Sequence, residues 1–109
     1  KINFIGGGNM TQAIINGLIN NGFEKNDIHV IEIDPAQRSK LQSELKISTS
    51  NVIDIDDLSI VILAVKPNQI QSVCESIKSK IDNHLIISIA AGVKIIKISD
   101  AKYTAGKSE

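Results

Sequence analysis

Residues 2–22 read INFIGGGNMTQAIINGLINNG: a short apolar run, three consecutive glycines, and a segment with helical spacing. The apolar run predicts a strand at Ile2–Ile5, and the apolar positions of Met10–Asn20 recur as on one face of a helix. Gly22 supplies the left-handed residue that commonly ends a helix. A second apolar run, Ile28–Ile33, predicts the next strand, so this stretch indicates a strand–helix–strand unit closed around a glycine-rich turn.

The rest of the chain continues to alternate strand-like and helix-like segments. Strands buried on both faces read as continuous apolar runs, and such strands separated by helices are typical of a parallel sheet. We expect an α/β, Rossmann-type, doubly wound and mainly parallel sheet over residues 1–99, and a frayed or truncated tail over residues 100–109. The further predicted elements are a helix from Asp34-Pro35 to Leu45, a strand at Ile47–Ser50, a helical turn at Asp54–Leu58, a strand at Ser59–Val65, a helix at Ile70–Ile81 and a strand at Leu85–Ile89.

Composition narrows the classes of function. The chain has 109 residues, 12 basic and 12 acidic side chains, and only 3% aromatic residues, which argues against nucleic acid as the main partner. A single cysteine cannot form an internal disulfide, and no apolar run approaches the roughly 20 residues that a membrane span needs. We therefore expect a cytoplasmic protein without a signal peptide. The lack of an initiator Met suggests a trimmed sequence.

The glycine turn lies where a dinucleotide-binding fingerprint requires it, after a strand and before a helix. Gly6 permits the tight turn, and Gly8 allows a pyrophosphate to approach the backbone. The amides of Asn9 and Met10 would then face that phosphate from the helix N-terminus. Thr11, a small residue, replaces the third glycine of the usual pattern. The alternative is a glycine-rich turn that binds no ligand.

Acidic residues follow the second strand, where a carboxylate commonly holds the adenosine ribose diol of NAD. Glu32 has nearly the expected spacing from the glycines, and Asp34 lies two residues further on. Both would repel a 2′-phosphate, whereas Arg38 is the nearby cation that would accept one. Asp34 also fits a simple helix cap, and Arg38 a solvated helix face. The sequence favours NAD over NADP.

Three motifs together resemble the N-terminal domain of pyrroline-5-carboxylate reductases. They are FIGGGNM at residues 4–10, AVKP at residues 64–67 and SIAAGV at residues 88–93, and they occur in that family's order and spacing. The resemblance implies NADPH- or NADH-dependent reduction of the imine 1-pyrroline-5-carboxylate to L-proline. The cofactor-binding residues that it implies, together with the two acids above, are Gly6, Gly8, Asn9, Met10, Glu32, Asp34, Asn51, Ala64, Val65, Lys66, Pro67, Ala90, Ala91 and Gly92.

Family members continue into a helical C-terminal domain that forms the dimer and supplies most substrate contacts, and this chain ends before it. We therefore expect a homo-oligomer for a full-length protein, and for this chain alone no turnover and a tendency to associate. Other readings are the cofactor domain of another β-hydroxyacid-dehydrogenase-like reductase, or a non-catalytic dinucleotide-sensing module.

No constellation of catalytic side chains stands out, because hydride transfer is chemistry that the cofactor carries. Lys66 is either a ligand contact or the polar end of a buried strand. Cys74 lies on an apolar helix face, which predicts core packing. The sequence has no Cys or Asp cluster at metal-ligand spacing around His29 or His84, so we expect no metal site.

Overall fold

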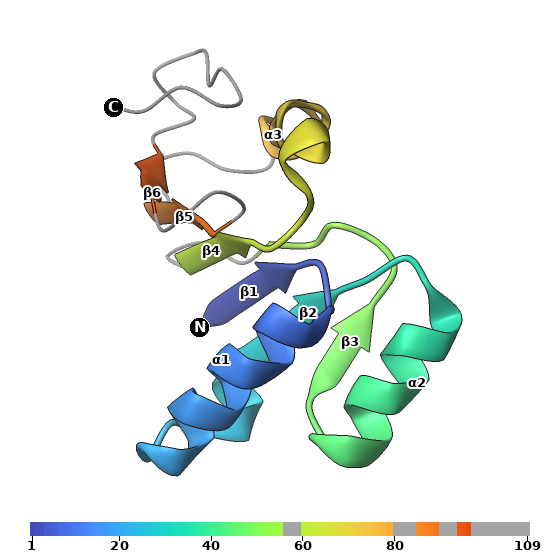
Figure 1. Ribbon diagram of the computed structural model, residues 1–109, viewed down its shortest axis with the longest axis vertical. Coiled ribbons are helices and arrows are strands. Elements are labelled where there is room, and N and C mark those ends of the chain that lie inside the picture. Colours follow the sequence, from blue (N-terminus) through green and yellow to red (C-terminus); the bar gives the residue numbers. More distant parts are fainter. Residues whose placement is uncertain (56–59, 80–84, 90–93, 97–109) are drawn as a thin grey trace.

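The fold is built on a six-stranded sheet in the order β3-β2-β1-β4-β5-β6, seen in the computed structural model (Figure 1). The model describes residues 1–55, 60–79, 85–89 and 94–96. Neighbouring strands from β3 to β5 pair in parallel, and β6 pairs antiparallel to β5. The strands are β1 (Ile2–Ile5), β2 (Ile28–Ile31), β3 (Ser48–Ser50), β4 (Ile60–Leu63), β5 (Leu85–Ser88) and β6 (Lys94–Ile96).

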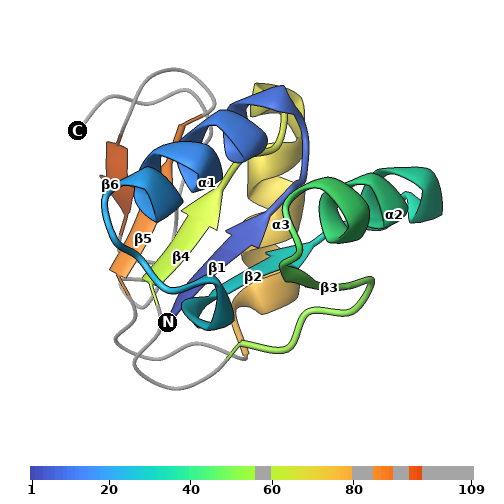
Figure 2. The same cartoon turned by 90° about the horizontal axis from the view of Figure 1, so that it is seen from below.

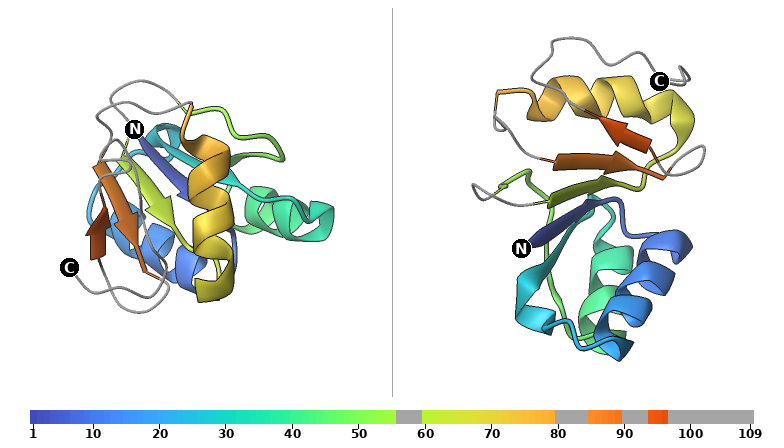
Figure 3. Two further views of the ribbon diagram at one scale, coloured as in Figure 1. Left: turned by 90° about the horizontal axis from the view of Figure 1, so that it is seen from above. Right: turned by 90° about the vertical axis from the view of Figure 1, so that its left-hand side faces the viewer.

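Helices cover both faces of the sheet. α1 (Asn9–Asn20) and α2 (Pro35–Glu44) pack on one face, and α3 (Ile70–Ile77) packs on the other. Figure 2 shows α1 in front of the strands with α3 behind them, and Figure 3 shows α3 from its own side. This arrangement confirms the predicted doubly wound α/β sheet. None of the described helices has the length and apolar character needed to cross a bilayer.

Two apolar clusters, one on each face, hold these layers together. Successive side chains of a strand point to opposite faces, so each central strand contributes to both clusters. In β1, Phe4 packs with the α1 and α2 layer, whereas Ile5 packs with α3. In β4, Ile62 and Leu63 divide in the same way. This division explains why the central strands are almost wholly apolar.

The structure shortens several predicted elements. β2 ends at Ile31, two residues earlier than predicted. The Glu32 amide still donates to the Ser50 carbonyl of β3 at 2.8 Å, but the carbonyls of Glu32 and Ile33 accept hydrogen bonds from Arg38 Nη1 at 2.7 and 3.0 Å. α3 ends at Ile77, and residues 80–84 lie outside the described part of the chain. Small end shifts also occur at α1, α2, β3, β4 and β5.

Two further differences concern whole elements. The predicted turn of helix at 54–58 is not formed at residues 54 and 55, and its other residues lie outside the described ranges. The antiparallel strand β6 was not predicted, because a run as short as Lys94–Ile96 carries no periodicity to distinguish it from a loop. The tail at 100–109 is also outside the described residues.

The turn between β1 and α1 depends on a close backbone approach at Gly6. Gly6 has φ of +103°, and a Cβ at this position would lie 2.5 Å from the carbonyl oxygen of Ala64. That oxygen belongs to the chain leaving β4, the neighbouring strand, so the contact cannot be relieved by a side-chain rotation. Thr11 Oγ1 donates to the Gly6 carbonyl at 2.6 Å, which ties the turn to the first turn of α1.

We expect Gly6→Ala to lower the free energy of unfolding by about 2 kcal/mol or more, because it adds a positive-φ penalty to a backbone clash. Gly17→Ala is the matched control, since Gly17 lies inside α1 and a Cβ there meets nothing within 4 Å. That variant should gain about 0.5–1 kcal/mol. Urea unfolding measures both, and equal effects of the two substitutions would contradict this account of the turn.

Candidate functional site

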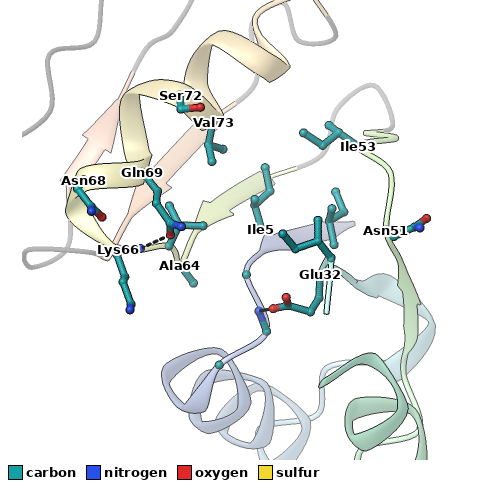
Figure 4. A pocket seen from close by; sticks show the side chains of 16 residues that line it. Ile5, Glu32, Asn51, Ile53, Ala64, Lys66, Asn68, Gln69, Ser72 and Val73 are labelled. Carbon is teal, nitrogen blue, oxygen red and sulfur yellow. Dashed lines mark hydrogen bonds between the residues drawn. The ribbon is translucent and has the colours of Figure 1, made fainter. Parts of the chain in front are cut away.

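A cavity of about 700 Å³ lies at the carboxyl ends of β1, β2 and β4 (Figure 4). Its size falls in the range of small-molecule and cofactor sites, and carboxyl strand ends are where open α/β sheets bind ligands. The lining residues come from the glycine turn, the ends of β2 and β3, the end of β4, and α3. They are Ile5, Gly6, Gly7, Gly8, Ile31, Glu32, Ile33, Asn51, Ile53, Ala64, Val65, Lys66, Asn68, Gln69, Ser72 and Val73.

The N-terminus of α1 opens beside the cavity at Gly8. Gly8 is the N-cap residue and has no side chain to satisfy the free amides of the first turn. The first intrahelical bond runs from the Gln12 amide to the Gly8 carbonyl at 3.1 Å. The first turn also carries no acidic residue. Its amides and the helix dipole therefore favour an anion at this point.

The peptide groups on both sides of Gly7 are held by side chains from three elements. The Gly7 amide donates to Glu32 Oε1 at 2.7 Å, from the end of β2. The Gly7 carbonyl accepts from Gln12 Nε2 of α1 at 3.2 Å and from Gln37 Nε2 of α2 at 2.5 Å. Sequence reasoning did not identify Gln12 and Gln37, because a lone glutamine on a polar helix face gives no signal of its long-range partner.

The two predicted acids have different positions. Glu32 lines the cavity, and its second oxygen, Oε2, accepts from the Asp34 amide at 3.0 Å. Asp34 is exposed and is not part of the cavity lining, and its Oδ1 caps α2 by accepting from the Ala36 amide at 3.1 Å. Asp34 therefore caps the helix, as one of its two interpretations predicts, and its contact with a cofactor stays a prediction.

Ala64, Val65 and Lys66, in the segment after β4, line the opposite wall of the cavity, and their contact with a cofactor stays a prediction. The Lys66 side chain is exposed and runs away from α3 in Figure 4. Its backbone amide donates to Gln69 Oε1 at 3.2 Å, which fixes the bend into α3. Pro67 begins the short 3-10 turn Pro67–Gln69 and lies outside the lining.

Polar residues of the α3 wall were missed from the sequence. Asn68, Gln69 and Ser72 line the cavity, and their amide and hydroxyl groups are not part of any recognisable motif.

Among the predicted residues, Asn51 lines the wall after β3, whereas exposed Asn9 and Met10 lie beside Gly8 at the start of α1 and outside the lining. The predicted residues at 90–92 fall outside the described part of the chain.

The cysteine and the described histidine lie outside the cavity lining. Cys74 is buried in the α3 core cluster, and burial raises the pKa of its thiol to about 11, so the thiolate nucleophile is suppressed. His29 lies in β2, and its ring nitrogens contact Ser48 Oγ at 2.7 Å and Ser50 Oγ at 3.0 Å. His84 lies outside the described residues. Within the described ranges, no group of three potential metal ligands gathers.

The sequence of this chain is similar to one family model and to several curated proteins. A family model described as NADP oxidoreductase, coenzyme F420-dependent, matches residues 1–92. Pyrroline-5-carboxylate reductase of Pasteurella multocida is 38% identical over 96% of this chain and 40% of its own length. The Vibrio alginolyticus enzyme of the same name is 36% identical over 92% of this chain and 38% of its own length.

A solved structure shares the fold. The structure of a pyrroline-5-carboxylate reductase from Coxiella burnetii superposes with a TM-score of 0.67 at 28% identity, covering 80% of this chain and 42% of that one. The chain thus spans about two fifths of the length of the relatives it matches.

We expect Gln37→Leu to lower the free energy of unfolding by about 1 kcal/mol, because it removes a part-buried hydrogen bond to the glycine turn. Gln42→Leu is the matched control on the same helix, where Gln42 donates to Thr49 Oγ1 at the exposed surface. That change should stay within about 0.5 kcal/mol. Denaturant unfolding compares the two variants. An equal fall in the free energy of unfolding for both would show that the contact of Gln37 with the glycine turn adds no more stability than an exposed hydrogen bond.

Proposed function

We propose, from the premise that this chain belongs to the family of coenzyme F420-dependent NADP oxidoreductases, that it is the cofactor-binding domain of a pyrroline-5-carboxylate reductase. The complete enzyme would reduce the imine of 1-pyrroline-5-carboxylate to L-proline with NADH or NADPH. Because this chain matches about two fifths of such enzymes, the substrate, the turnover and a homo-oligomer all belong to the proposal for the full-length protein.

One observation carries the cofactor assignment: an uncapped helix N-terminus opens beside a cavity at the strand ends. A dinucleotide pyrophosphate is the anion that such a turn commonly accepts. Gly8 lines the cavity, and a Cβ there would enter space with nothing within 4 Å. The backbone at this point is therefore open to close approach, as a bound pyrophosphate requires, and the residues present fit the group.

The remaining contacts follow from position around the cavity. Glu32 and Asn51, at the ends of neighbouring strands, would contact the adenosine ribose and its surroundings. The segment Ala64–Pro67 would run along the nicotinamide end, with Lys66 contributing its backbone. The family resemblance adds Ala90, Ala91 and Gly92 beneath the nicotinamide ribose. Gly6, Asn9 and Met10 complete the turn around the pyrophosphate.

The chemistry of this half of the enzyme consists of binding and orientation. When bound, the reduced nicotinamide supplies the hydride. Orientation of the reacting partners provides much of the acceleration in such reactions. Ile5, Val65 and Val73 give the cavity an apolar wall against which a ligand can pack. Glu32 is held by two backbone amides and is therefore assigned to ligand recognition rather than to proton transfer.

The cofactor assignment predicts that NADH or NADPH raises the thermal midpoint of this chain. Gly8→Ala should weaken dinucleotide binding by about tenfold or more, because the methyl group would occupy the open space beside the α1 N-terminus. Its free energy of unfolding without ligand should fall by about 0.5–1 kcal/mol, because alanine is a poorer N-cap residue than glycine. Gly17→Ala, far along α1, should leave binding unchanged.

Calorimetric titration measures these affinities, and a chain that binds neither dinucleotide would overturn the proposal. The reaction itself is tested on the full-length protein that contains this chain. Addition of 1-pyrroline-5-carboxylate should cause oxidation of the reduced nicotinamide and formation of proline. Dinucleotide binding without such turnover would favour a sensing module.

A further inference from the structure

We propose that His29 is a positioning residue for the ligand: its ring donates a hydrogen bond to Ser50, and Ser50 in turn fixes the cavity wall at residues 51–53. The inference rests on the proposed cofactor binding and adds to it a residue outside the cavity lining. It also gives a role to a half-buried histidine that the contacts assigned to the cofactor leave unused.

His29 connects two serines on one face of the edge strand. Its strand, β2, pairs in parallel with β3, and His29 lies opposite Ser48 in that register. Ser48 and Ser50 are two residues apart, so their side chains leave β3 on the same face as the imidazole. Nδ1 of the ring lies 2.7 Å from Ser48 Oγ, and Nε2 lies 3.0 Å from Ser50 Oγ. Both ring nitrogens are thus directed at the edge of the sheet.

The direction of these hydrogen bonds follows from the serine protons. Each hydroxyl has one proton, and a neutral imidazole has one N–H. Ser50 Oγ donates to the Val52 carbonyl at 2.9 Å, so its lone pairs accept from His29 Nε2. Ser48 Oγ lies 3.4 Å from the Ile28 carbonyl, a long contact that it can give up in order to donate to Nδ1. The neutral ring is therefore protonated at Nε2, and an imidazolium would donate to Ser50 in the same way.

Ser50 passes this contact on to the cavity wall. Within the part of the chain that the structure describes, its bond to the Val52 carbonyl is the one hydrogen bond that reaches residues 51–53. Asn51 and Ile53 line the cavity, and Figure 4 shows them on the segment that leaves β3, across the cavity from α3. Ile53 packs against the apolar cluster beneath α3, whereas Val52 is 60% exposed. The path of this segment therefore depends on the Ser50 hydroxyl.

The same wall meets the part of the ligand assigned to adenosine. With the N–H of His29 on one side of Ser50 Oγ, the hydroxyl proton is directed to the other side, toward the Val52 carbonyl. A wall that is ordered before the ligand arrives does not have to be ordered on binding. Loss of the histidine contact should therefore weaken binding by about threefold to tenfold, the equilibrium weight of one hydrogen bond.

The experiment measures the affinity of the full chain for two probes by calorimetric titration. ADP-ribose covers the adenosine end and the pyrophosphate, whereas inorganic pyrophosphate covers the glycine turn alone. Ser50→Ala and His29→Asn should weaken the binding of ADP-ribose by about threefold or more and change that of inorganic pyrophosphate by less than about twofold. A general loss of structure would weaken both probes, so the difference between them isolates the wall.

Matched variants separate the two contacts of the ring. A glutamine amide reaches the position of Nε2, so His29→Gln should bind ADP-ribose within about twofold of the wild-type affinity, whereas the shorter asparagine reaches Nδ1 alone. Ser48→Ala removes the other partner of the ring and should also stay within about twofold. The double variant His29→Asn/Ser50→Ala should bind as weakly as either single variant, because both changes remove one contact.

Equal ADP-ribose affinities of the wild type, Ser50→Ala and His29→Asn would overturn the inference, as would an equal loss from Ser48→Ala and Ser50→Ala. A loss from Ser50→Ala without one from His29→Asn would assign the wall to the serine and remove the role of the histidine. Failure of the folded wild-type chain to bind NADH, NADPH and ADP-ribose would instead defeat the proposed function, and this inference with it.

Discussion

The close approach of β1 and β4 at the glycine turn is the constraint on which the rest of the structure depends. The chain leaves β1 at Gly6 beside the backbone of Ala64, with no room for a side chain. α1 begins at Asn9, directly after the three glycines, and its N-terminus therefore lies beside the carboxyl ends of the strands. The cavity is a geometric result of that turn as much as of the residues that line it.

The glycine turn is also the point where separate elements meet. Side chains from β2, α1 and α2 converge on Gly7, so the layer on one face of the sheet is connected to the mouth of the cavity. A Cβ at Gly7 would lie 2.7 Å from Leu41 Cδ1, in a core residue of α2, so a larger residue at this position would require the Leu41 side chain to shift. Gly7 and Gly8 both line the cavity, and Gly7 also packs closely against the α2 layer.

Much of this could be predicted from the sequence, because the decisive signals are local. The apolar runs of the central strands and the glycines after β1 identify the fold without any knowledge of distant contacts. The end of β2 could not be predicted, because Ile33 continues the apolar run and nothing local in the sequence shows that Arg38 contacts the carbonyls of Glu32 and Ile33. The polar residues of the α3 wall could not be predicted for a similar reason. In the sequence, Asn68 and Ser72 resemble ordinary solvated residues, and only the topology brings them to the same cavity as Glu32. The roles of the site residues themselves stay predictions.

Glu32 has a consequence for how such a protein could change in evolution. The same carboxylate supports the backbone of the glycine turn and lines the cavity. Replacement of Glu32 by a residue without a carboxylate would leave one or both of these backbone amides without an acceptor, at a cost in stability. Position 32 can therefore vary in evolution only together with compensating changes around Gly7 and Asp34, so this part of the cavity wall is inherited with the architecture of the turn.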